Sequence, residues 1–130
     1  MFIRRVVFGI AVFFLTCTLV VGGEKVLTPK QARDQVGEKI TLKMKVVAAK
    51  DRLQKRGEIY LDSEEDFKSP DNFAVIITRK GAASLKKSNI DSPAKHFQDK
   101  IIQVTGSVKE VDGVPLIEVD DSKQIRLLEK

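Results

Sequence analysis

The chain has 130 residues, a formal net charge of +5 and one cysteine. This length leaves room for one domain and excludes a second domain within the chain. A single cysteine excludes an internal disulfide and a site built from several thiolates, and the mildly basic charge permits a polyanionic partner without requiring one.

The N-terminal segment has the pattern of a secretory signal peptide. Two arginines near the start are followed by a predominantly apolar run at 6–21, and cleavage is predicted before Glu24. The run holds 16 residues, fewer than the roughly 20 that span a bilayer comfortably. We therefore predict a signal peptide over 1–23, a single domain over 24–130, and a periplasmic or secreted location.

Two other fates of this leader stay open. An uncleaved leader would anchor the domain in the membrane, and Cys17 would be the attachment point if the chain were lipid-modified. Thr16 disfavours the lipid, since a smaller residue usually precedes such a cysteine. Cleavage leaves a domain without cysteine, and the loss of the two arginines lowers the net charge from +5 to +3 because every acidic residue lies at Glu24 or beyond.

A short helix is predicted at the start of the domain. Thr28 and Gln31 have the spacing of a capping box, and Pro29 suits the first turn of a helix. Gly37 is expected to end this helix as a left-handed cap.

The remainder of the domain is predicted to be mostly β. Alternating or continuous apolar patterns predict strands at 38–46, 58–62, 73–78, 100–111, 114–119 and 125–128. Polar or charged composition predicts loops at 51–57 and 63–72, and short helical turns are predicted at 81–89 and 95–97.

Two of these strands are long and carry signs of a bend. Alternation is lost at 46–49, and Gly106 interrupts the second long strand, where a missing side chain lets the backbone turn sharply. Asp112 and Gly113 form a tight-turn signal after that strand. The order strand, strand, strand, helix, strand, strand predicts an all-β fold, a five-stranded Greek-key OB barrel preceded by a short helix.

Three segments carry a resemblance to a known family. Residues 28–42, 73–77 and 97–119 resemble the opening, the third strand and the closing half of small exported bacterial OB-fold domains. These domains are similar to the nucleic-acid-binding OB superfamily, in the branch that includes anticodon-binding modules. The resemblance covers essentially the whole mature chain and implies the fold; a nucleic-acid partner is implied only by analogy.

Nucleic-acid binding requires cations along the phosphates and aromatic faces on which bases stack. The candidate cations gather around the first three strands and the first loop: Lys43, Lys45, Arg52, Lys55, Arg56 and Arg79. Tyr60 is the first stacking candidate because its neighbours should point inward, and Phe73 is the second, with a core position as the alternative. Acidic residues at 62–66, followed directly by Phe67, and a non-basic loop at 109–112 leave open an ordinary solvated face of mixed charge.

The sequence offers no catalytic or metal motif. His96 is the single histidine and is expected on the surface beside Phe97. The acidic residues at 62–66 lack the glycine and terminal glutamate of an EF-hand loop. Nucleophile signatures, phosphate loops and the clustered acids and arginines of a staphylococcal-type nuclease are also missing, so we expect neither enzyme activity nor a cofactor or metal.

Two functions from different classes follow. The first is an exported, non-catalytic OB module whose outer strand face binds single-stranded nucleic acid or another extended polyanion. The alternative is an envelope protein-interaction module that uses the same face without nucleic acid. Fold analogy favours the first, and export favours the second.

Overall fold

The computed structural model describes residues 25–128, and the predicted signal peptide over 1–23 lies outside them. The strands are β1 (Val26–Leu27), β2 (Lys39–Lys45), β3 (Ala48–Arg52), β4 (Glu58–Asp62), β5 (Ala74–Thr78), β6 (Ile101–Val111), β7 (Val114–Val119) and β8 (Ile125–Leu127). The helical segments are α1 (Pro29–Ala32), α2 (Leu53–Arg56), α3 (Arg79–Lys87), α4 (Pro93–Phe97) and the 3-10 turn η2 (Ser122–Gln124).

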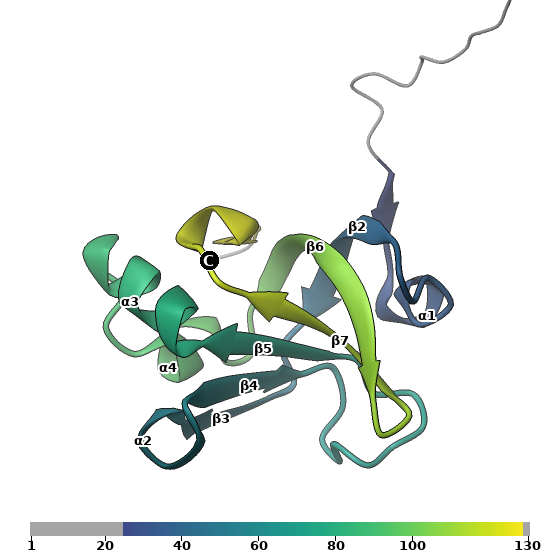
Figure 1. The fold of residues 1–130 in the computed structure, drawn as a ribbon, viewed down its shortest axis with the longest axis horizontal. Helices are drawn as coiled ribbons and strands as arrows, with labels where there is room; N and C mark the ends of the chain where they lie inside the picture. The colour runs from purple at the N-terminus through teal and green to yellow at the C-terminus, as the bar shows by residue number, and fades with distance from the viewer. Residues whose placement is uncertain (1–24, 129–130) are drawn as a thin grey trace, which may run out of the picture.

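The strands close into a barrel through one bent strand. Only Val46 and Val47 separate β2 from β3, so these two strands are halves of one strand that turns between two neighbours. β2 pairs with β6, β6 with β7, β7 with β5, β5 with β4, and β4 with β3, which completes the ring (Figure 1). Only β5 and β7 run parallel within this ring. This is the Greek-key order of the predicted five-stranded OB barrel, so the fold prediction is confirmed.

The two additional strands extend the ring at one side. β1 runs parallel to β2, and β8 pairs antiparallel with the first half of β6. The tight turn between β6 and β7 is confirmed as well: Asp112 and Gly113 both have positive φ angles, of 53° and 79°.

Alternation along the strands sets the core. Leu42, Met44 and Val46 are buried, whereas Lys43 and Lys45 between them are exposed. The two largest fully buried side chains are Phe73, which lies just before β5, and Phe97, which lies in α4.

The first helix is shorter than predicted. The capping box between Thr28 and Gln31 forms, but α1 ends at Ala32 and Gly37 does not cap it. Gly37 does have a left-handed φ of 93°, and its N–H donates to the Val108 carbonyl at 2.8 Å. The glycine therefore turns the chain into the barrel one tight turn after the helix has ended.

The predicted charged loop at 51–57 contains ordered structure. β3 continues to Arg52, and one helical turn, α2, closes at Gly57 in the left-handed conformation with φ of 73°. α3 begins at Arg79, two residues earlier than predicted, because the Thr78 hydroxyl accepts the Gly81 N–H.

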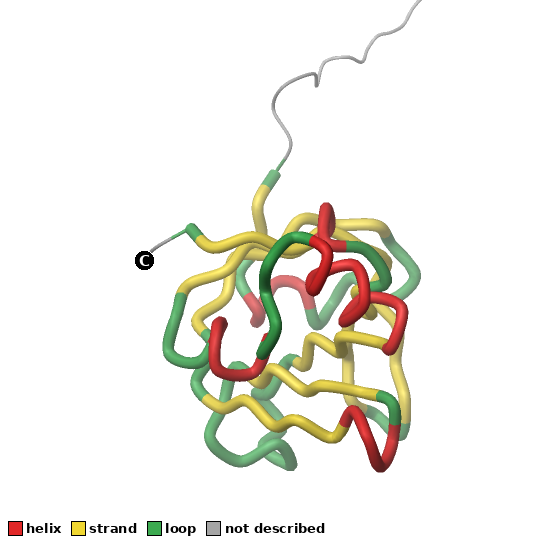
Figure 2. The backbone as a smooth tube through the Cα atoms, turned by 90° about the vertical axis from the view of Figure 1, so that its left-hand side faces the viewer, coloured by secondary structure: helices red, strands yellow, loops and turns green. Residues whose placement is uncertain are grey.

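The helical segments lie at the rim of the strands rather than in a separate layer (Figure 2). Within residues 25–128, no helix has the length and apolar composition needed to cross a membrane.

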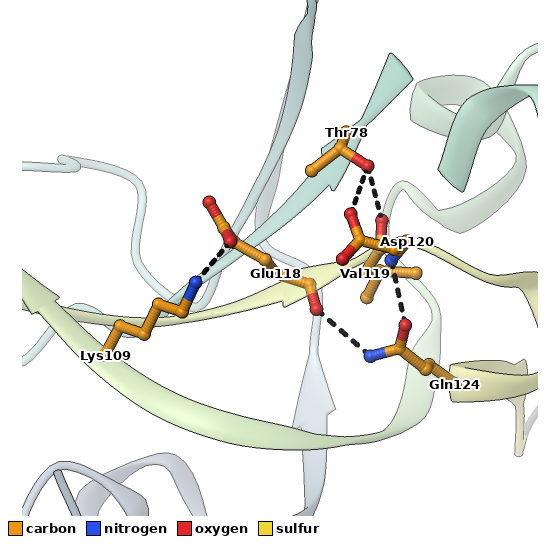
Figure 3. Close-up of polar contacts among 6 residues, drawn as sticks. All are labelled: Thr78, Lys109, Glu118, Val119, Asp120 and Gln124. Carbon is orange, nitrogen blue, oxygen red and sulfur yellow. Dashed lines mark hydrogen bonds and ion pairs between the residues drawn. The ribbon is translucent and has the colours of Figure 1, made fainter. Parts of the chain in front are cut away.

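A polar network holds the open end of the β6–β7 pair (Figure 3). The Gln124 amide donates to the carbonyls of Thr105 and Glu118 at 3.0 Å each, and its oxygen accepts the Asp120 N–H at 2.8 Å. These carbonyls lie where β6 and β7 have separated, since their ladder runs only as far as Val108. The side chain of η2 thus replaces the missing backbone partner.

Candidate functional site

A groove of about 540 Å³ lies on the outer face of the barrel. Its lining comes from β3, β4, β5, β6 and β7, from α2, and from the connecting segment 63–72: Lys50, Arg52, Lys55, Arg56, Tyr60, Asp62, Phe67, Asn72, Ala74, Ile76, Val111, Val114 and Leu116. α2 lies at one end of β3 and β4, and the 63–72 loop and the β6–β7 hairpin lie together at the other end (Figure 1). The groove therefore has two chemically different ends.

The floor in the middle of the groove is apolar. Ala74, Ile76 and Leu116 form a small buried cluster separate from the barrel core, and the Tyr60 ring packs against it. Ile59 and Leu61 point into the core, so Tyr60 between them points outward, as predicted.

Tyr60 is held in place by a neighbour on its own strand. Its hydroxyl donates to the Glu58 carboxylate at 2.6 Å. This hydrogen bond, with partial burial and the charge of Glu58, raises the pKa of the Tyr60 phenol above its ordinary value of 10.0. The ring is therefore both neutral at physiological pH and restricted in orientation.

A second aromatic ring comes from the 63–72 loop. Phe67 is 49% exposed, and the Lys50 ammonium lies 4.7 Å from its ring centroid, in cation–π contact. Sequence reasoning placed Phe67 in a solvated acidic stretch and did not consider Lys50. Two features of the sequence could have indicated these residues. Phe67 is an aromatic residue in an otherwise polar loop, and Lys50 lies two residues before Arg52 and therefore on the same face of the strand.

A buried carboxylate stands at the loop end of the groove. Asp62 is 3% exposed, and its Oδ1 accepts a hydrogen bond from the Asn72 amide at 3.0 Å. Burial raises the pKa of Asp62, and the Asn72 hydrogen bond and the Lys50 charge partly oppose that rise. The Asn72 side chain also accepts the Glu64 N–H at 3.0 Å, so it fastens the loop to the barrel.

The predicted cations separate into two groups. Arg52, Lys55 and Arg56 line the groove at its α2 end. Arg79 lies beside this end, where a Cβ on Gly57 would come within 2.8 Å of the Arg79 Nε, but its side chain does not line the groove.

Three predicted residues lie elsewhere. Lys43 and Lys45 stand on β2, before the bend, and Lys45 lines a separate hollow of about 400 Å³ beside α1. Phe73 is fully buried in the barrel core, so it is unavailable for stacking. Phe73 is the first residue after the 63–72 loop, and its side chain already points inward.

The remaining polar candidates do not gather into a second site. The His96 ring contacts Phe97 edge-on with centroids 4.8 Å apart, as expected from its position. Among residues 25–128, no group of three or more histidine, cysteine, aspartate and glutamate side chains is placed to hold a metal ion.

Comparison with protein-family models and with curated sequences gives no match. Among solved structures, the chain is similar to one named as an aspartyl-tRNA synthetase from Leishmania major Friedlin, with a TM-score of 0.56 and 9% identity over 91% of this chain and 23% of that one. An asparaginyl-tRNA synthetase from Pyrococcus horikoshii gives a TM-score of 0.52 and 14% identity over 79% and 23%.

A third similar structure is a small binding domain. OBody AM1L10 bound to hen egg-white lysozyme gives a TM-score of 0.55 and 14% identity, over 85% of this chain and 99% of that one. Our chain spans less than a quarter of the two synthetases. At these identities the likeness shows the fold alone, which is that of an OB barrel.

Proposed function

We propose that the groove binds single-stranded nucleic acid. The observation that carries this proposal is the combination, in one groove, of two surface-accessible aromatic rings, Tyr60 and Phe67, with four cationic side chains. Bases stack on aromatic faces whatever their sequence, and lysine and arginine follow the phosphates between them. A solvated face of mixed charge would not need the apolar floor on which Tyr60 rests.

The two ends of the groove suggest how a strand lies in it. Arg52, Lys55 and Arg56 provide a phosphate-binding end beside α2, and the rings and apolar floor provide a stacking surface towards the loop. Asp62 is the single carboxylate among the lining residues, and it is buried. The groove as a whole is therefore cationic and attracts a polyanion.

A protein partner is the second candidate function. Its support is the apolar floor of Ala74, Ile76 and Leu116, together with the similar fold of an OBody bound to lysozyme. A mainly apolar interface loses little affinity as salt rises, whereas phosphate contacts release counterions and lose affinity steeply. Salt dependence therefore separates the two functions.

We also propose that the protein is exported and acts without catalysis. The support is the basic and apolar pattern of residues 1–23 and the lack of nucleophile and phosphate-loop motifs in the sequence. Mass spectrometry of the protein recovered from its producing cells tests the export proposal: a chain that starts at Glu24 supports it, and an intact N-terminus in the cytoplasm contradicts it.

Binding is tested through the tyrosine itself. The sequence has one tyrosine and no tryptophan, so tyrosine emission reports on the groove alone. We expect a single-stranded oligonucleotide to quench this emission, and we expect Tyr60→Ala to weaken binding, followed by the anisotropy of a labelled oligonucleotide, by about 1–3 kcal/mol. Tyr60→Phe is the matched control, because it keeps the ring. An oligonucleotide that fails to bind even at low salt would contradict the proposal.

A further inference from the structure

We propose that the loop end of the groove selects nucleobases that carry an exocyclic amino group, through a hydrogen bond to Asp62. The inference rests on the proposed binding of single-stranded nucleic acid and adds a preference to it. Cytosine, adenine and guanine carry such an amino group, whereas uracil and thymine present a carbonyl oxygen at the corresponding pyrimidine position.

The Asp62 carboxylate has one oxygen available for a ligand. Oδ1 accepts the Asn72 amide, and within residues 25–128 Oδ2 has no hydrogen-bond partner. Oδ2 is also not fully buried. Among residues 25–128, the one fully buried side-chain nitrogen or oxygen without a hydrogen-bond partner is Nε of Arg33. Oδ2 thus keeps contact with solvent, in a residue that is only 3% exposed and that lines the groove.

The surroundings fix the direction of this oxygen. Asn72 is a positioning residue: its amide group holds Asp62 Oδ1, and its carbonyl oxygen is occupied by the Glu64 N–H. Its amide also lies 3.4 Å from the Phe67 carbonyl, so the loop, the amide and the carboxylate form one unit. An acceptor held in this way discriminates better than a mobile surface carboxylate, because less freedom is lost on binding.

The rings and the carboxylate are spaced for one base. Tyr60 and Asp62 are two positions apart on the same face of β4, which corresponds to about 6.6 Å along the strand. Lys50 lies opposite Tyr60 in the register and over the Phe67 ring, so both rings and the carboxylate border the same space. A base that stacks on either ring can direct its edge towards Asp62 Oδ2.

The chemistry predicts which bases fit. An amino group donates to the carboxylate, whereas a carbonyl oxygen at the same position brings two acceptors together and leaves both unpaired. Cytosine and uracil have rings of the same size and differ at this position and at the adjacent ring nitrogen, which accepts in cytosine and donates in uracil. Comparing them therefore tests the hydrogen-bonding edge at constant ring size, and the Asp62 variant assigns the effect.

The experiment measures anisotropy of labelled deoxycytidine and deoxyuridine oligomers of about eight nucleotides, a length within the range that one OB barrel covers. We expect the protein to bind the cytosine oligomer about tenfold more tightly at neutral pH, the size of one hydrogen bond to a charged group. Asp62→Asn should remove or reverse this preference, because an asparagine amide can donate to the uracil carbonyl.

The control is the substitution Glu118→Gln on the same sheet. The Glu118 carboxylate is already bound by the Lys109 ammonium at 2.7 Å (Figure 3). This substitution makes the same charge change as Asp62→Asn and should leave the cytosine preference intact. Thermal melts establish that each variant is folded, and the wild-type comparison of the two oligomers tests the inference without any variant.

The outcomes separate the inference from the function on which it rests. Equal affinity of the wild-type protein for both oligomers overturns the amino-group preference and leaves nucleic-acid binding in place. A preference that persists in a folded Asp62→Asn variant also overturns the role of Asp62. Failure to bind either oligomer at low salt overturns the proposed function and the inference together.

Discussion

At the scale of single residues, two carboxylates have different roles in the groove. Glu58 holds the Tyr60 hydroxyl, and Asp62 lies buried under the Asn72 amide. Each carboxylate has a measurable consequence for the titration of the protein, because Glu58 raises the pKa of Tyr60 and burial raises the pKa of Asp62 itself.

Tyr60 should titrate at a higher pH than an ordinary tyrosine. Its hydroxyl donates to Glu58, and ionisation would break that hydrogen bond and place two negative charges together. Since the chain has one tyrosine, absorbance of tyrosinate near pH 10 measures this pKa directly. Glu58→Ala should lower the pKa, and an unchanged titration in that variant would show that the hydrogen bond does not form in solution.

Asp62 should make the protein less stable as the pH rises. A pKa raised by folding means that the native state holds its proton where the unfolded chain has released it, so the stabilisation is complete below about pH 4 and is lost as the pH rises through the folded pKa. Asparagine at this position removes that loss and keeps an acceptor for Asn72. Urea unfolding should show that the free energy of unfolding of Asp62→Asn rises relative to that of the wild-type protein from pH 4 upwards. If the two free energies change with pH in parallel, burial of the charge is contradicted.

At the scale of elements, the bent strand decides which side chains meet. β2 and β3 are continuous in sequence, but the bend between them sends Lys45 towards α1 and Lys50 and Arg52 into the groove. A second element-level feature is η2, whose Gln124 supplies hydrogen bonds where β6 and β7 have separated.

Replacing Gln124 should therefore weaken the whole barrel. Gln124→Ala leaves the Thr105 and Glu118 carbonyls without their partner, which should lower the free energy of unfolding by about 1–3 kcal/mol. Denaturant unfolding followed by circular dichroism measures the change. Gln54→Ala, on the exposed surface of α2, is the control; a loss of the same size there would contradict a special role for Gln124.

The sequence was informative where structure is local. Alternating or continuous apolar patterns located β2 and β4 to β8, and Asp112 with Gly113 located the hairpin, because these signals depend only on neighbouring residues. They missed β1, and β3 extends into the predicted 51–57 loop. The capping box at Thr28 formed, yet the helix length was wrong, since Gly37 is used by a long-range contact to Val108.

The candidate site was less accessible to sequence reasoning because it is assembled by closure of the barrel. Tyr60 and three cations were found from strand alternation and charge. Phe67 was passed over because a loop's path is set by tertiary contacts, here the hydrogen bonds of Asn72, which no local pattern encodes. Lys43 and Lys45 were grouped with the others because a one-dimensional pattern does not show the two halves of a bent strand facing different sides.

At the scale of the whole molecule, positive charge is distributed unevenly over a small barrel. Cations are found on several faces, but the structure brings those near α2 together with two aromatic rings and leaves those on β2 outside the groove. On a uniform basic surface, every cation would contribute alike to the affinity for a polyanion. With a groove, the contribution of a cation depends on whether it lies in the groove as well as on its charge.

The most direct measurement compares two double variants that each remove two cations. Lys55→Ala with Arg56→Ala changes the groove, and Lys43→Ala with Lys45→Ala changes β2. Anisotropy of a labelled single-stranded oligonucleotide over a series of salt concentrations gives the slope of log affinity against log salt. We predict that the groove variant lowers the magnitude of this slope by about 1.4, since each neutralised phosphate on a single strand contributes about 0.7, and that the β2 variant leaves it unchanged. Equal losses in both variants, or a slope near zero in the wild-type protein, would contradict a nucleic-acid groove on this face of the barrel.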